Sequence, residues 1–199
     1  MGLNLDYNNG QTPLDEDEKE GLLIPTITTR EELDEFEQLN IEKAVEYYLL
    51  RRNFKKEDIL SEKFIFEVHK RMLGDVWKWA GTIRRSNKNL GVDKLQIPPL
   101  SRQLIENCRY WIENKTFPEE EITIRFKHEI VSIHVFPNGN GRHSRLMADI
   151  IMKHIFKKPV FSWGHKDLIH QSKVRDEYIK ALREADKGDI TNLIKFSRL

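Results

Sequence analysis

The strongest constraint on the fold is a glycine-containing run, residues 134–145, that separates two stretches of helical periodicity. Apolar residues recur at helical spacing from position 122 to 133, and residues 142–151 again follow a helical pattern. Between them lie Gly139 and Gly141, which can adopt positive φ without steric cost. The run therefore predicts a short loop between two helices.

The residue types in this run suit an anionic ligand. Backbone amides turned by the glycines, and the N-terminus of the following helix, attract phosphate groups. Arg142 and Arg145 are three residues apart, so both guanidinium groups lie on one helical face and can hold separate phosphoryl groups. His134 can accept a proton near neutral pH. A purely structural glycine-rich turn is the alternative, but two arginines at a helix start oppose the helix dipole.

The run resembles the signature of the Fic family, H-x-F-x-[DE]-G-N-G-R-x-x-R. Residues 79–82 with 91–99 look like the flap of that family, and residues 185–189 look like its closing helix. The resemblance covers residues from about 35 to 199, and the whole chain is similar to the stand-alone bacterial group labelled mobile mystery protein B. The matching positions are His134, Phe136, Gly139, Asn140, Gly141, Arg142 and Arg145.

This resemblance implies an activity: transfer of AMP from ATP to a Ser, Thr or Tyr hydroxyl of a target protein, with Mg²⁺. It assigns His134 as the base and Phe136 as the anchor of the loop in the core. It places the phosphates of ATP on Gly139, Asn140, Gly141, Arg142 and Arg145.

The flap would dock an extended segment of the target by adding a strand through backbone hydrogen bonds. Asn87, Asn89 and Gly91 are turn residues within a stretch that is otherwise compatible with β-strands. We therefore expect a small β-hairpin there. The residues predicted to dock the target are Asn89, Leu90, Gly91, Val92 and Ile97.

One position departs from the signature, because Asn138 stands where the family usually has an acid. A neutral amide oxygen is a weaker Mg²⁺ ligand than a carboxylate. Three outcomes remain open: Mg²⁺ held by ATP, water and Asn138 with lower activity; another phosphate donor or transfer polarity; or a non-catalytic, nucleotide-binding module of a toxin–antitoxin-like system. We favour the first, since the base and both arginines are present.

Many relatives in this family are restrained by a glutamate that pairs with the second motif arginine, here Arg145. No clear inhibitory string is present, but Glu32 and Glu37 are candidates, and a solvated acidic helix face is an equal alternative. Residues 1–34 then form an N-terminal arm with a regulatory segment, and residues 35–199 form the Fic domain.

Composition limits the other classes of function. The 199 residues carry a formal net charge of +1, which argues against nucleic acid or an anionic membrane as a partner. A single cysteine, Cys108, and no recognisable leader or membrane-spanning run predict a cytoplasmic protein. An antitoxin or regulatory partner and a homodimer stay open.

The chain as a whole is predicted to be mostly all-α, a Fic-like helical bundle with a small β-hairpin flap. Helical periodicity, caps and breakers predict helices over residues 29–52, 58–73, 101–114, 118–133, 142–158, 173–186 and 190–196.

Overall fold

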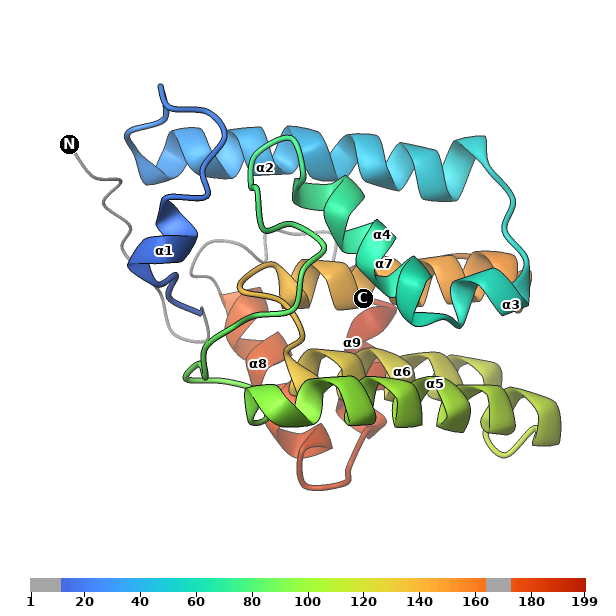
Figure 1. The fold of residues 1–199 in the computed structure, drawn as a ribbon. Coiled ribbons are helices and arrows are strands. Elements are labelled where there is room, and N and C mark those ends of the chain that lie inside the picture. The colour runs from blue at the N-terminus through green and yellow to red at the C-terminus, as the bar shows by residue number, and fades with distance from the viewer. Residues whose placement is uncertain (1–11, 164–172) are drawn as a thin grey trace.

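The computed structural model describes residues 12–163 and 173–199, and the part of the chain that it describes is helical with irregular connections (Figure 1). The predicted all-α fold class is confirmed. The helical elements, in chain order, are α1 Glu16–Lys19, α2 Arg30–Val45, the π-helical η1 Glu46–Arg51, α3 Lys56–Ile59, α4 Glu62–Leu73, the 3₁₀ turn η2 Lys94–Gln96, α5 Ile97–Asn114, α6 Glu119–Ile133, α7 Asn140–His154, α8 Lys173–Ala185 and α9 Thr191–Ser197.

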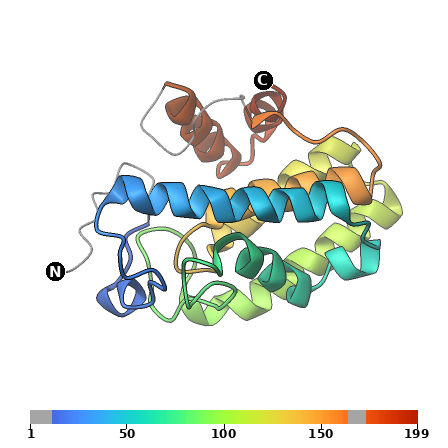
Figure 2. The ribbon, with the colours of Figure 1, turned by 90° about the horizontal axis from the view of Figure 1, so that it is seen from above.

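The helices pack in pairs around α7. α6 lies between α7 and α5 and packs along both of them. α2 packs along α4. α8 and α9 pack together, and the view from above shows them as a separate layer beside the rest (Figure 2). Most of the apolar core lies among α2, α4, α5, α6 and α7, and a second cluster joins α7 to α8 and α9.

Local signals explain where the N-terminal helices begin. The Thr29 hydroxyl accepts the Glu32 amide at 3.2 Å, and the Glu32 carboxylate accepts the amides of Thr28 and Thr29, so α2 opens on a capping box. Ser61 caps α4 in the same manner by accepting the Phe64 amide. The helix predicted over residues 58–73 is consequently interrupted at Leu60 and Ser61, between α3 and α4.

The flap region differs in detail from the expected hairpin. Residues 83–93 form turns and bends without a strand, and α5 begins at Ile97 rather than near residue 101. Ile97 is fully buried as the first residue of α5, with Pro98 and Pro99 in the first turn, where a missing amide hydrogen costs nothing. Ile97 therefore belongs to the helix core and not to the exposed flap.

The arm before α2 packs on the body. Leu14 and Ile27 are buried, and backbone hydrogen bonds join Leu23 to Val76 and Lys78 to Gly21. Residues 1–11 of the predicted arm lie outside the described residues, and the predicted boundary at position 34 falls inside α2. No helix of the described residues has the length and apolar character that crossing a membrane requires.

Candidate active site

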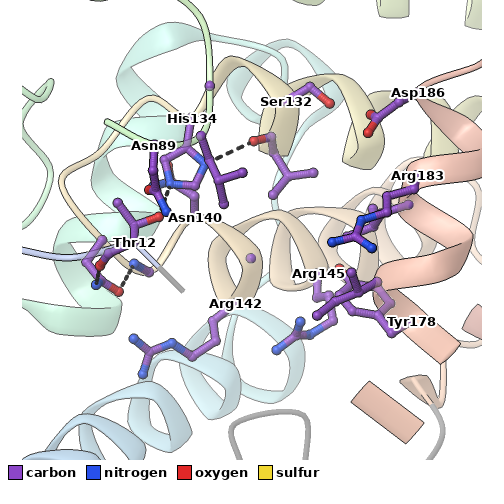
Figure 3. Close-up of a pocket in the computed structure, with 18 of the residues that line it drawn as sticks. Thr12, Asn89, Ser132, His134, Asn140, Arg142, Arg145, Tyr178, Arg183 and Asp186 are labelled. Atoms are coloured by element: carbon purple, nitrogen blue, oxygen red, sulfur yellow. Dashed lines mark hydrogen bonds between the residues drawn. The ribbon is translucent and has the colours of Figure 1, made fainter. Parts of the chain in front are cut away.

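One cavity of about 510 Å³ collects most of the motif residues (Figure 3). Its walls are the C-terminus of α6, the loop after it, the N-terminus of α7, flap residues 89–92 and one face of α8. Thr12 of the arm and Arg30 of α2 complete the lining. Five arginines face this cavity, which makes it suited to a ligand with several negative charges: Arg30, Arg142, Arg145, Arg175 and Arg183.

His134 ends α6 in the left-handed conformation, with φ of 58°, and its side chain is buried. Its Nδ1 lies 3.3 Å from the Val131 carbonyl oxygen, which can only accept, so Nδ1 carries the hydrogen in the neutral ring. Nε2 is then the proton acceptor, and it lies 2.8 Å from Thr12 Oγ1. Burial lowers the pKa of His134 to about 4, so the ring is neutral at pH 7 and competent as a base.

Arg84 holds the flap against His134. This buried side chain donates from Nε to the His134 carbonyl at 2.6 Å and from its Nη atoms to the carbonyls of Ser86 and Val92. Gly91 has φ of 96°, and a Cβ there would overlap the Cβ of His134. The flap backbone can therefore approach the imidazole only because position 91 is glycine.

The loop between α6 and α7 is fixed from within and from α4. The Asn140 side chain accepts the Phe136 amide at 2.9 Å and donates to the Phe136 carbonyl at 2.8 Å. The Phe136 ring is fully buried and stacks on His69 with ring centroids 3.7 Å apart. His69 accepts the Gly81 amide at Nδ1, so its Nε2 donates to the Asn138 carbonyl at 3.0 Å.

The N-terminus of α7 faces the cavity with room for a ligand. Gly139 stands before the helix with φ of 76°, where a Cβ would come within 2.6 Å of Leu73. A Cβ on Gly141 would meet nothing closer among the described residues than Arg145 Nη1, at 3.9 Å. The residue at the cap is a glycine without a side chain to bond the first amides of α7, so these amides are available to an anion.

The two motif arginines have different partners. Arg142 Nη1 lies 2.5 Å from Glu37 Oε2 of α2, and the other carboxylate oxygen of Glu37 accepts the Trp77 indole at 2.6 Å. The Arg145 guanidinium lies 5.6 Å from the centre of the Tyr178 ring on α8. Burial alone would raise the pKa of Tyr178, but the neighbouring cations Lys127 and Arg145 lower it overall.

The two candidate inhibitory glutamates lie in different places. Glu32 is exposed and caps α2, as its contacts with Thr28 and Thr29 show. Glu37 is buried and reaches the motif, but it pairs with the first arginine, Arg142, instead of the second, which the resemblance implied. The structure pairs no described carboxylate with Arg145.

Both polar atoms of the Asn138 side-chain amide are hydrogen-bonded. Its Oδ1 accepts the Gly139 amide at 2.6 Å, and its Nδ2 donates to the Thr12 carbonyl at 2.9 Å. Among the described residues, no three metal-binding side chains of His, Cys, Asp or Glu come together. This donor set does not fit a resident Mg²⁺ ion, so the metal would have to bind largely through the phosphates of a nucleotide.

The sequence interpretation missed two parts of the site. Tyr178 and Leu182, on the apolar face of α8, line the cavity, together with Ile179, Arg183 and Asp186. Their spacing along α8 was a usable signal of one shared face. Thr12 carries no pattern in the sequence, and only the packing of the arm brings it to His134.

Comparison with known proteins agrees with this geometry. The sequence model described as the Fic/DOC family matches residues 59–152. The chain is 27% identical over 168 residues to a protein adenylyltransferase Fic from Aedes aegypti, covering 82% of this chain and 32% of the relative. It is 29% identical over 159 residues to a probable protein adenylyltransferase from Aquifex aeolicus, covering 76% and 45%. The chain thus spans less than half the length of these relatives.

The solved structures carry the same fold. BepC from Bartonella tribocorum, determined with bound AMPPNP, superposes with a TM-score of 0.65 at 14% identity, covering 92% of this chain and 96% of BepC. In this chain the histidine that ends α6 and the glycine-containing start of α7 share one cavity of the helical bundle. Over residues 59–152 the chain is similar to the Fic/DOC family. Membership of the mobile mystery protein B group stays a prediction.

Proposed function

We propose that this protein transfers AMP from ATP to a hydroxyl side chain of a target protein. The observation that carries the proposal is the shared cavity: a neutral imidazole with an unprotonated acceptor nitrogen opens onto the same space as an uncapped helix N-terminus and five arginines. The names of the relatives, protein adenylyltransferases, support the same reaction.

In this proposal each group acts on a different part of the reaction. His134 Nε2 takes the proton of the attacking hydroxyl, and the backbone at Asn140 and Gly141 holds the α- and β-phosphates. Gly139 contributes the turn before the helix, because its amide already donates to Asn138 Oδ1. Arg142 and Arg145 hold the outer phosphates. Apolar residues of α8 that line the cavity offer surface for the base and ribose: Ile179 and Leu182.

Asn140 contributes through its backbone, because its side chain is already engaged with the backbone of Phe136. Asn138 as a metal ligand is the weakest assignment, since its oxygen accepts the Gly139 amide. Mg²⁺ brought in with the nucleotide would supply positive charge that favours departure of the leaving group. Residues 89–92 of the flap remain the proposed dock for the target, while Ile97 is structural.

The experiment is transfer from α-labelled ATP. The full chain, with Mg²⁺ and a cell lysate, should label itself or a lysate protein, and His134→Ala should abolish the label. His134→Ala should still bind ATP, because the imidazole lies at the attacking side and not on the phosphates. Loss of ATP binding in this variant would instead mean that the fold of the loop was damaged.

A second function has a specific observation behind it. Because both ends of the Asn138 amide are already hydrogen-bonded, the site as it stands suits nucleotide binding without turnover. If ATP binds but no label is transferred, even by Asn138→Asp, the protein is a nucleotide-binding module. An antitoxin or regulatory partner, a homodimer and a cytoplasmic location remain predictions.

A further inference from the structure

The Thr12 hydroxyl lies where the proposed reaction needs the hydroxyl that accepts AMP, next to His134. Its Oγ1 lies 2.8 Å from His134 Nε2, and Nε2 is the nitrogen left without hydrogen once Nδ1 donates to Val131. The hydroxyl is therefore the donor in this hydrogen bond. This is the contact that a general base makes with a nucleophile before it takes the proton.

The arm is held in this position by contacts at Thr12 itself and at Asp15, further along the chain. The Thr12 carbonyl accepts a hydrogen from Asn138 Nδ2 at 2.9 Å, so the arm is tied to the motif loop, and Figure 3 shows Thr12 beside His134. Asp15 pairs with Lys88 at 2.9 Å and accepts the Ser86 hydroxyl. The arm thus occupies the flap side of the cavity, with a hydroxyl presented to the base.

Thr12 also lines the cavity that holds the arginines and the start of α7. The residue as a whole is 6% exposed, so the hydroxyl is largely shielded from bulk solvent. A nucleotide whose phosphates lie on Gly141 and the arginines would meet the Thr12 hydroxyl inside the same space. The contacts are intramolecular, so the effective concentration of this acceptor far exceeds that of a target in solution.

We propose that Thr12 is a modification site, and that the chain transfers AMP from ATP to its own Thr12 hydroxyl within one molecule. This inference rests on the proposed function and adds an acceptor to it. Thr12 Oγ1 forms a bond to the α-phosphorus, and the bond from the α-phosphorus to the oxygen bridging to the β-phosphorus breaks. The hydroxyl proton passes to His134 Nε2, and pyrophosphate leaves.

The test is site-resolved mass spectrometry of the full chain after incubation with ATP and Mg²⁺. We expect a gain of up to one AMP per chain, located on Thr12. Thr12→Ser keeps the hydroxyl and should be modified, whereas the isosteric Thr12→Val should not. Thr28→Val, a change to an exposed threonine of the same arm, should leave the modification of Thr12 intact.

Two measurements establish that the reaction is intramolecular. The first-order rate constant should not change when the chain is diluted tenfold at saturating ATP. A tagged His134→Ala chain mixed with the parent chain should remain unmodified at Thr12. Modification of that tagged chain, or a rate that falls with dilution, would overturn the placement of Thr12 as an acceptor in its own molecule.

The outcomes also separate this inference from the proposed function. If lysate proteins are labelled while Thr12 stays unmodified, the transferase proposal stands and the self-modification is wrong. Self-modification is equally wrong if Thr12→Val transfers AMP to other proteins faster than the parent does while Thr12 of the parent carries no AMP, because Thr12 then only blocks the base. If no protein and no Thr12 is labelled, both proposals fail together.

Discussion

Replacing Glu37 by glutamine is expected to raise the affinity for ATP and to lower the thermal stability of the nucleotide-free protein. Glu37 and Arg142 form an ion pair of 2.5 Å, in which 6% of the glutamate side chain and 18% of the arginine side chain are exposed. A polyphosphate on the start of α7 has to compete with this carboxylate for Arg142. Glutamine keeps the volume and can still accept the Trp77 indole, but it carries no charge for Arg142.

The size of the effect follows from the strength of one charge-assisted pair. A hydrogen bond to a charged group contributes about 1.5–3 kcal/mol. Freeing Arg142 from it should raise the affinity for ATP about 10- to 100-fold, since about 1.4 kcal/mol is a factor of ten. The same loss should lower the Tm without nucleotide by roughly 3–12 °C for a chain of this size.

The assay is a calorimetric titration with a non-hydrolysable ATP analogue, paired with thermal unfolding with and without it. Glu32→Gln is the matched control: it makes the same chemical change on the same helix, and glutamine still serves in a capping box. Glu32→Gln should leave the ATP affinity unchanged. A Glu37→Gln protein with lower Tm but unchanged affinity would refute the competition and leave Glu37 as a structural partner only.

Three further predictions follow from the site. Asn138→Asp adds a charged oxygen ligand, so labelling should be faster and half-maximal at lower Mg²⁺ than in the parent; an unchanged Mg²⁺ titration would contradict this. Gly91→Ala should lose activity and about 1–3 kcal/mol of stability by urea unfolding, because its Cβ would overlap the Cβ of His134. Gly188→Ala, with φ of 97° and no described atom within 4 Å, is the control for backbone strain alone. Burial lowers the pKa of His134 and of His143 to about 4, so their contribution to stability is full above about pH 6.5 and is lost as pH falls toward 4, which urea unfolding at several pH values should show.

Helical periodicity and caps predicted most of the fold because those signals are local. The capping box at Thr29, the glycine at position 139 and the proline before α6 each act within one turn of their helix. The flap could not be predicted in the same way. Its conformation depends on the buried Arg84, which donates to the carbonyl of Val92 within the flap and to that of His134, 50 positions away in the sequence.

Within the site, too, residues of the local motif could be predicted from the sequence, whereas residues from distant segments could not. The motif run carries its own spacing, so His134, Arg142 and Arg145 could be named from the sequence alone and do share one cavity. Glu37 and Thr12 are brought to the motif from separate segments, α2 and the arm. No periodicity marks either residue, because the contacts span 105 and 122 positions of the chain.

In both of these long-range contacts, a group that the reaction would use already has a partner within the same chain. The nitrogen that must accept a proton already holds a hydroxyl, and an arginine that should meet phosphate already holds a carboxylate. The two contacts share no residue and come from different segments, so phosphate would replace Glu37 at Arg142, while only the hydroxyl of another protein would have to replace Thr12 at His134. ATP binding should therefore respond to Glu37 and little to the Thr12 hydroxyl, whereas the choice of acceptor should respond to Thr12 and little to Glu37. If Glu37→Gln and Thr12→Val both changed ATP affinity, or both changed the choice of acceptor, by the same amount, the two contacts would be coupled and this explanation would be wrong.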